Sequence, residues 1–225
     1  MSPRSSSFPS TVLVTGGASG IGAATVGLLE REGAEVRVLD LRDGFDVADP
    51  DAWESVEPVD FAFLNAGVST GVADVAELTD ELYRRAVGAN VDGVVFGVRR
   101  LARVMEPGSA IVATASLAGL TAMPHDPVYT LTKHAVVGFV RSVAPQLAGR
   151  GIRVNALCPG FADTPIVPAE LREELAGQGV PLIAPERVAE AVLAAARSPE
   201  TGQAWVVQPG REPLVYEFRG VPGPR

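Results

Sequence analysis

The sequence is poor in the residues that build disulfides and metal centres. Its 225 residues include one cysteine, Cys158, and two histidines, His125 and His134. A single thiol cannot form a disulfide within the chain, and this set is too small for a cysteine- or histidine-built metal site. We therefore expect no metal at the functional site.

The chain also has little positive charge and no long apolar run. Nineteen basic residues stand against 27 acidic ones, which gives a formal net charge of −8. Because phosphate backbones attract basic surfaces, this balance argues against a nucleic-acid partner. No apolar run is long enough to span a bilayer, and the first residues lack the apolar core of a signal peptide. We expect a cytoplasmic protein that acts on a small molecule, without a membrane partner.

Lysine is the scarcest charged residue. Lys133 is the only lysine among the nineteen basic residues, and all the others are arginine. Such a bias is typical of a GC-rich genome and says little by itself about function. It suggests, weakly, that position 133 needs a compact ammonium group where a planar guanidinium would not serve.

The length and the hydrophobic content fit one folded domain. With 47% hydrophobic residues, the chain can bury a substantial core. Residues 1–10 are rich in serine and proline, and residues 220–225 contain two prolines and two glycines, so both ends are predicted to be flexible tails. We place a single domain at residues 11–219, because no repeat or linker divides it.

Strand patterns alternate with helix patterns along the chain. Short apolar runs predict strands at residues 11–15, 35–40, 59–64, 109–115, 152–157 and 204–207. Helices are predicted between them at residues 20–33, 79–105, 128–148 and 185–197. This order is typical of an α/β protein, and we predict a single-domain Rossmann fold, a doubly wound parallel sheet with helices on both faces. Such sheets bind ligands beyond the carboxyl ends of their strands.

A glycine-rich segment follows the first predicted strand and opens the first helix. It runs from Thr15 to Gly22, and its glycines allow a tight turn and a close approach of the backbone to a pyrophosphate. Glycine loops also serve as simple turns, but Asp40, which ends the next strand, favours a dinucleotide site. A carboxylate there accepts hydrogen bonds from ribose hydroxyls and repels a 2′-phosphate, so NAD is favoured over NADP. The nearby Arg42 keeps NADP as the alternative.

A tyrosine and the lone lysine lie four residues apart in a predicted helix. This spacing places Tyr129 and Lys133 on one face, and Ser116 ends the preceding strand. A free tyrosine has a pKa of about 10 and is a poor base at neutral pH. A nearby ammonium and a positively charged nicotinamide ring would lower that pKa, so that the tyrosine could take the proton of an alcohol. The pair alone is also common on ordinary helix surfaces.

Together these motifs resemble the short-chain dehydrogenase/reductase family. The match extends over nearly the whole chain and also includes Asn65–Gly67, Asn90 and Pro159-Gly160. The resemblance implies an NAD-dependent oxidoreductase acting on CH–OH groups, which interconverts a secondary alcohol and a ketone with Tyr129 as general acid/base. It implies a catalytic tetrad of Asn90, Ser116, Tyr129 and Lys133.

The resemblance also implies roles for individual binding residues. Asn90 would hold a water that connects Lys133 to solvent, and Asp46 and Val47 would flank adenine. Thr164 would contact the nicotinamide carboxamide. The residues expected to bind the cofactor are Gly16, Ser19, Gly20, Ile21, Gly22, Asp40, Leu41, Asp46, Val47, Asn65, Ala66, Gly67, Tyr129, Lys133, Pro159, Gly160, Ala162 and Thr164. The residues expected to contact the substrate are Ser116, His125 and Tyr129.

Within the family, the sequence looks most similar to the NAD-dependent 15-hydroxyprostaglandin dehydrogenase group. The likeness rests on stretches such as Ser116–Leu120 and Asn155–Phe161, and on Tyr216 and Phe218 near the chain end. It implies a secondary alcohol or ketone on a fairly apolar molecule. His125 corresponds to a substrate-facing glutamine of that group, although an exposed loop histidine without a role is an equal alternative.

Family members pair two of their helices across subunits. The corresponding regions here, residues 88–105 and 128–148, carry more apolar positions than one face of a sheet needs. We therefore expect a homodimer or a homotetramer.

Two segments are shorter than the family pattern. Five residues separate Asp40 from Asp46, where the family has a helix and a longer connection, and a parallel crossover needs about a dozen residues. We expect a trimmed sheet edge on the adenine side. Residues 164–185 are short for a substrate lid, which predicts a shallow and open pocket.

Two other functions can use similar motifs. A nucleotide-binding sensor or scaffold could keep the fold without turnover, but it would need only the glycine loop, so the presence of the tetrad argues against it. A nucleotide-sugar epimerase uses a similar tyrosine–lysine pair, but such chains are usually longer and carry a further substrate domain.

Overall fold

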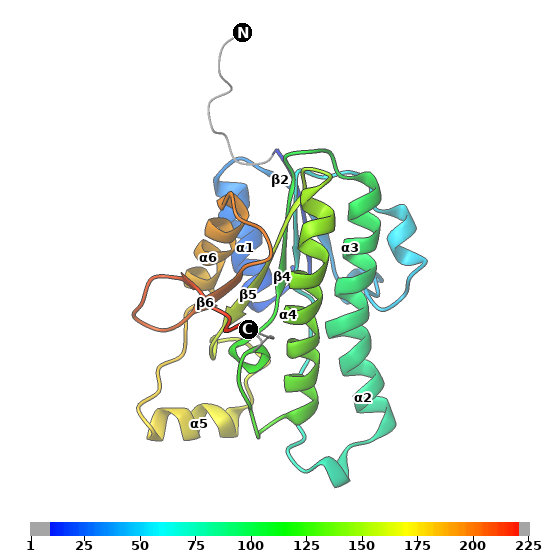
Figure 1. Ribbon diagram of the computed structural model, residues 1–225. Coiled ribbons are helices and arrows are strands. Elements are labelled where there is room, and N and C mark those ends of the chain that lie inside the picture. The colour runs from blue at the N-terminus through cyan, green and yellow to red at the C-terminus, as the bar shows by residue number, and fades with distance from the viewer. Residues whose placement is uncertain (1–9, 221–225) are drawn as a thin grey trace, which may run out of the picture.

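The computed structural model describes residues 10–220, and its centre is a seven-stranded sheet (Figure 1). The strand order is β2-β1-β3-β4-β5-β6-β7, with the first six strands parallel and β7 antiparallel to β6. The strands are β1 (Thr11–Thr15), β2 (Glu35–Leu39), β3 (Phe61–Leu64), β4 (Ala110–Thr114), β5 (Arg153–Pro159), β6 (Ala204–Val207) and β7 (Leu214–Val215). Apart from residues 10 and 220, the two predicted tails lie outside the described residues.

Helices cover both faces of this sheet, as the doubly wound prediction requires. On one face, α1 (Gly20–Arg31) and α6 (Pro185–Arg197) pack against each other, and α3 (Gly93–Val104) and α4 (Pro127–Ala148) cover the other face (Figure 1). The inner strands β1, β3, β4 and β5 are buried on both sides for this reason. In β3, Phe61 and Phe63 belong to one apolar core and Ala62 and Leu64 to the other.

The long helix predicted at residues 79–105 is interrupted. Helix α2 (Asp80–Val87) leads into a π-helical turn (Gly88–Asp92), which continues as α3. The turn contains Asn90, which is fully buried and bonded to groups distant in sequence. π-Turns often mark functional positions, and such distant contacts leave no trace in a local apolar pattern.

The sheet edge next to the glycine loop is trimmed, as the short spacing after Asp40 predicts. The chain leaves β2 through one 3₁₀ turn (Leu41–Asp43), and β2 is the last strand on that side. The next strand, β3, pairs with the opposite side of β1. The topological switch point therefore lies between β1 and β3, where parallel sheets bind their ligands.

The segment expected to be a short lid contains a helix that the sequence pattern did not predict. Helix α5 (Ala169–Gly177) lies beyond the carboxyl ends of the strands, at the bottom of Figure 1. Within residues 10–220, no helix has both the length and the apolar character needed to cross a bilayer.

Candidate active site

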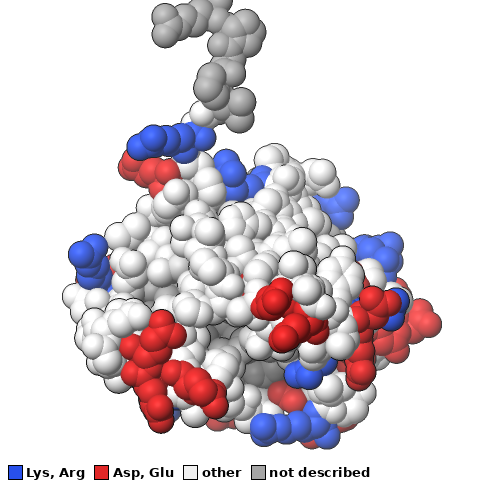
Figure 2. Space-filling view, turned by 90° about the horizontal axis from the view of Figure 1, so that it is seen from below, with Lys and Arg blue, Asp and Glu red and all other residues white. Residues whose placement is uncertain are grey.

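A cavity of about 930 Å³ opens at the carboxyl ends of the parallel strands. Figure 2 looks onto this end of the molecule and shows a surface that is hollowed, with acidic side chains gathered beside the hollow. Binding sites for small molecules usually measure about 300–1,000 Å³. The cavity has the size of a small-molecule site, and α5 from the short segment at residues 164–185 supplies part of its wall.

The structure brings the predicted site residues together around this one cavity. Each residue expected to bind cofactor or substrate lines it, with the exception of Gly22. Three members of the expected tetrad, Ser116, Tyr129 and Lys133, also line it, whereas Asn90 lies buried behind the wall.

The glycine loop is held so tightly that side chains would not fit at two positions. Gly16 has φ +64°, and a Cβ atom there would lie 2.9 Å from the Cα atom of Ala66. At Gly22 a Cβ atom would lie 2.1 Å from the carbonyl oxygen of Gly16. Gly22 therefore lets α1 begin directly against the loop, and its contribution to a cofactor site is to shape the loop.

Hydrogen bonds join the loops that follow β1, β3 and β4. The Thr15 hydroxyl accepts from the backbone N–H groups of Asn65 (2.9 Å) and Ala66 (3.1 Å). The Asn65 amide donates to the carbonyl of Gly16 (3.2 Å), and its oxygen accepts from the Thr114 hydroxyl (3.2 Å). The floor of the cavity is therefore fixed before any ligand binds.

Asp40 lies at the adenosine end of this floor, next to the glycine loop. Its carboxylate accepts hydrogen bonds from the backbone N–H groups of Ala18 (3.1 Å) and Arg42 (3.1 Å). A carboxylate has about four lone-pair sites, so two acceptor positions stay available for ribose hydroxyls. The Arg42 guanidinium donates to the carbonyl of Ala18 (3.2 Å), which holds it near the same point.

Thr164 provides a test of whether a nicotinamide fits the other end. Thr164 lines the cavity with its methyl group beside Gly20, and its buried hydroxyl has no hydrogen-bond partner within the described residues. A buried hydroxyl without a partner costs about 1–3 kcal/mol. A carboxamide, which both donates and accepts, would satisfy it, so the residues present fit the cofactor.

The side chains expected to carry the chemistry lie in the wall opposite the glycine loop. Lys133 is 2% exposed, and its ammonium donates to the carbonyl of Thr114 (2.8 Å). The Lys133 nitrogen lies 5.3 Å from the centre of the Tyr129 ring. The Ser116 hydroxyl accepts from the N–H of Ala118 (3.1 Å) and hydrogen-bonds the Tyr129 side chain.

Burial has the largest effect on the pKa of the tyrosine. Burial raises the pKa of Tyr129 to about 12; the hydrogen bond from Ser116 opposes this shift, and the Asp126 carboxylate adds to it. Burial also lowers the pKa of Lys133 to about 8. Removing both groups from water disfavours both charged forms, and the ammonium alone does not compensate for this.

Asn90 lies buried behind the cavity wall, where it binds the loop after β3 and helix α4. Its side-chain oxygen accepts from the N–H of Val68 (2.7 Å), and its amide donates to the carbonyl of Val68 (2.9 Å) and to the Thr132 hydroxyl (3.0 Å). A Cβ atom at Gly67 would lie 2.9 Å from the Asn90 oxygen and 3.4 Å from the Lys133 nitrogen. Asn90 thus lies behind Gly67, close to the ammonium. Its water-holding role stays a prediction.

Sequence reasoning missed one wall of the cavity. Residues Val68–Gly71 and Asp126 line it, and Asp126 is bonded to the 69–71 segment. The signal that was available is Asp126 directly before Pro127, the common pattern for an acid that caps a helix whose first residue is proline. That pattern gives no hint of a second segment bonded to the same carboxylate.

The residues with alternative interpretations are also placed by the structure. His125 is exposed and lines the cavity, which leaves both of its interpretations open. His134 lies on the helix surface with its ring 2.9 Å from the carbonyl of Thr130, and Cys158 and Trp53 are buried in the core. Among residues 10–220, no group of three or more potential metal-ligating side chains is arranged around one point.

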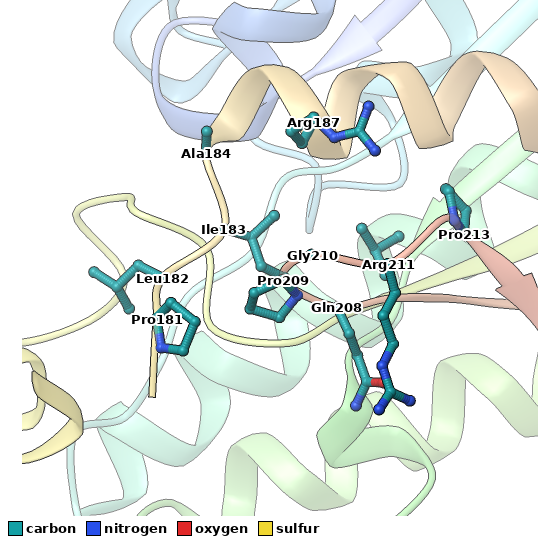
Figure 3. A pocket seen from close by; sticks show the side chains of 11 residues that line it. Pro181, Leu182, Ile183, Ala184, Arg187, Gln208, Pro209, Gly210, Arg211 and Pro213 are labelled. Atoms are coloured by element: carbon teal, nitrogen blue, oxygen red, sulfur yellow. The ribbon is translucent and has the colours of Figure 1, made fainter. Parts of the chain in front are cut away.

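A second cavity, of about 380 Å³, lies beyond the Pro159-Gly160 loop. Residues Pro181–Ala184 and Val207–Arg211 form most of it, with Gln208 and Arg211 among the side chains that line it (Figure 3). Arg187, also in its lining, pairs with Glu190 and with Glu212 at 3.3 Å. None of the expected catalytic side chains lines this cavity, so we assign the chemistry to the larger one.

Comparison with known proteins agrees with this site. The sequence profile of a family described as enoyl-(acyl carrier protein) reductase matches residues 46–210. The cis-4-hydroxycyclohexanecarboxylate dehydrogenase of Sinomonas cyclohexanicum is 35% identical over 214 residues, which cover 80% of this chain and 86% of that protein. The 3beta-hydroxysteroid dehydrogenase 2 of Eggerthella lenta is 34% identical over 187 residues, with coverage of 69% and 72%.

A solved structure shows the same architecture at lower sequence identity. The protein BdcA, in complex with NADPH, superposes with a TM-score of 0.78 and 28% identity, over 88% of this chain and 92% of that one. Since the family profile and the relatives both match most of the sequence, the chain belongs to the short-chain dehydrogenase/reductase family.

Proposed function

We propose that this protein is an NAD-dependent oxidoreductase that interconverts a secondary alcohol and a ketone on an apolar molecule. The observation that carries the proposal is that Ser116, Tyr129 and Lys133 line the same cavity as the glycine loop. The names of the two curated relatives describe dehydrogenases of a hydroxycyclohexane carboxylate and of a hydroxysteroid. Both compounds carry their hydroxyl group on a ring carbon, which makes each a secondary alcohol.

In this proposal Tyr129 moves the proton and the other side chains support it. A bound nicotinamide cofactor accepts or supplies the hydride. Tyr129 takes the hydroxyl proton during oxidation and returns it during reduction, while Ser116 hydrogen-bonds the substrate oxygen. Lys133, with a pKa of about 8, stays mostly protonated at neutral pH and provides positive charge beside the tyrosine. Because the Tyr129 pKa is raised to about 12, further positive charge at the site is needed to bring it into range.

Asp40 supports NAD as the cofactor. Its carboxylate lies at the end of β2 beside the glycine loop, where a 2′-phosphate would meet a negative charge. Arg42 is the opposing observation, since its guanidinium lies at the same point and could pair with a phosphate. NADP is therefore the alternative cofactor, and BdcA, which binds NADPH, is an example of that choice on this fold.

The assembly and the narrower relationship also belong to the proposal. A homodimer or homotetramer is supported by large apolar side chains that stay exposed, Leu131 on α4 and Leu214 and Val215 on β7. Light scattering coupled to gel filtration would measure the assembly, and a monomer at micromolar concentration would contradict it. Similarity to the 15-hydroxyprostaglandin dehydrogenase group and a cytoplasmic location stay predictions from the sequence.

A panel of secondary alcohols with NAD and with NADP tests the function. It includes cyclohexanol, cis-4-hydroxycyclohexanecarboxylate and a 3β-hydroxysteroid, and the near-ultraviolet absorbance of the reduced cofactor reports turnover. Turnover with NAD that disappears in Tyr129→Phe, while NADH still binds, is the expected result. Tight NADH binding without turnover of any alcohol would favour the sensor or scaffold instead, and a preference for NADP would refute the role of Asp40.

A further inference from the structure

Asp126 has more hydrogen bonds than a helix cap requires. The carboxylate is 6% exposed and precedes Pro127, the first residue of α4. One oxygen accepts from the N–H of Tyr129 (2.8 Å), which is sufficient to cap the helix. Four more donors reach the same carboxylate from residues 69–71, more than fifty positions away in the sequence.

These four donors belong to the loop that follows β3. The Ser69 hydroxyl (2.7 Å), the Thr70 N–H (2.7 Å) and the Gly71 N–H (3.1 Å) donate to one carboxylate oxygen. The Thr70 hydroxyl donates to the other oxygen (2.7 Å). Burial alone would raise the pKa of Asp126, but the hydrogen bonds from Tyr129, Ser69 and Thr70 outweigh it and hold the pKa below its usual value. Asp126 is therefore a buried anion stabilised by neutral donors.

The two segments that Asp126 joins both line the active-site cavity. Ser69, Thr70 and Gly71 belong to the loop after β3 and Tyr129 to the first turn of α4, and Asp126 bonds both. The loop is also held from its other end, because Asn90 bonds both the N–H and the carbonyl of Val68. Asp126 joins this loop directly to the first turn of α4, and Asn90 joins Val68 to Thr132 one turn further along the helix.

We propose that Asp126 is a positioning residue for the reaction: it fixes Tyr129 to the loop Ser69–Gly71 and so sets the opening into which the substrate oxygen must fit. This proposal rests on the proposed function, in which Tyr129 is the acid/base. Misplacing a reacting group by about 1 Å can lower the rate about a hundredfold. Loss of the hydrogen bonds to Asp126 should therefore affect turnover more than binding.

The charge of Asp126 gives it a second effect on the tyrosine. The titratable groups that act on Tyr129 are Lys133, Cys158 and Asp126, while His125 lies on the same loop as Asp126. The Asp126 carboxylate contributes to the raised pKa of Tyr129. Removing the charge lowers the pKa of the base, and in the direction of alcohol oxidation the rise of kcat with pH should then occur at lower pH.

Three variants separate positioning from simple capping. Asp126→Ser keeps a capping acceptor for the Tyr129 N–H but is too short to hold the loop, and Asp126→Asn keeps the shape without the charge. The matched control is Asp74→Ser, because Asp74 is an exposed cap that accepts from Ala76 (2.9 Å) outside the cavity lining. Each is measured with NAD and the best alcohol of the panel, together with melting temperature, NADH affinity and amide hydrogen exchange of residues 66–73.

The expected results distinguish a positioning role of Asp126 from helix capping alone. Asp126→Ser should lower the melting temperature, because the donors at residues 69–71 lose a buried acceptor, and should keep most of the NADH affinity. At a temperature where the variant is fully folded, it should lower kcat by about ten- to a hundredfold and speed exchange at residues 70 and 71. Asp126→Asn should move the pH profile of kcat to lower pH, and Asp74→Ser should match the wild type in every measurement.

Two outcomes would overturn the proposal. If Asp126→Ser keeps the wild-type kcat, Asp126 acts only as a helix cap. If both Asp126 variants lose activity in proportion to lost melting temperature, without a shift of the pH profile, the role is structural. If the wild-type protein shows no turnover, the proposed function itself is wrong. Measuring the wild type alone therefore distinguishes a failure of the proposed function from a failure of the positioning role of Asp126.

Discussion

Replacing Lys133 by methionine should separate the stability of the fold from its chemistry. Burial lowers the pKa of Lys133 from 10.5 to about 8, so keeping the ammonium charged at neutral pH costs about 3 kcal/mol, at about 1.4 kcal/mol per pKa unit. Methionine has a similar unbranched shape without the charge. Its cost is the unpaired carbonyl of Thr114, about 1–3 kcal/mol. The variant should therefore melt no lower than the wild type, and up to about 6 °C higher.

The same pKa shift predicts a dependence on pH. Between about 8 and 10.5 the unfolded lysine binds more protons than the folded one, so the wild type gains stability as the pH rises through this range. The pKa values of Cys158 and Tyr129 are raised by burial, which works in the opposite direction at higher pH in both proteins. The difference between wild type and Lys133→Met isolates the lysine: the wild type should gain about 3 kcal/mol relative to the variant between pH 8 and 10.5, so that any advantage of the variant disappears and reverses.

Thermal unfolding of both proteins across this pH range is the assay, and activity is measured alongside it. Lys133→Met should lose turnover at every pH although its fold is intact. Lys133→Arg keeps the charge, but Gly67 leaves little room around the ammonium, so the larger group overpacks the site at a cost of about 1–3 kcal/mol and loses most activity. A fully active Lys133→Arg, or a stability difference that does not change with pH, would refute this reasoning.

Two further predictions concern the cofactor. Asp40→Ser removes an acceptor for the ribose hydroxyls and a negative charge beside Arg42, so NADH should bind about ten- to a hundredfold more weakly and NADPH more tightly; equal losses for both, measured by fluorescence titration, would contradict the assignment. Thr164→Val removes a buried hydroxyl that has no partner in the described structure. The melting temperature of the free protein should stay the same or rise, while NADH affinity falls about fivefold by the same titration; unchanged affinity would mean that the hydroxyl does not meet the cofactor.

The parts of the site that could be predicted from the sequence are those encoded by short continuous segments. The glycine loop of residues 15–22 and the four-residue spacing of Tyr129 and Lys133 each lie within one turn or one helix, so local patterns are sufficient to place them. The parallel order of strands and helices follows from the same local patterns. The short connection after Asp40 likewise predicted the trimmed sheet edge, since five residues cannot form a crossover.

The parts that escaped prediction depend on contacts between distant segments. The π-turn at Asn90 is accompanied by bonds to Val68 and Thr132, 22 and 42 residues away. The hydrogen bonds between Asp126 and residues 69–71 likewise join segments that are distant in the sequence. The depth of burial, which raises the pKa of Tyr129, also could not be read from a spacing of four.

The central claim is that Tyr129, supported by Ser116 and Lys133, exchanges the hydroxyl proton of an alcohol while a bound nicotinamide cofactor would exchange the hydride. A secondary alcohol deuterated at its carbinol carbon, incubated with NAD and the protein, tests this most directly. Mass spectrometry of the reduced cofactor should show one deuterium with the wild type and none with Tyr129→Phe. Reduced cofactor without deuterium, or equal labelling with Tyr129→Phe, would contradict it.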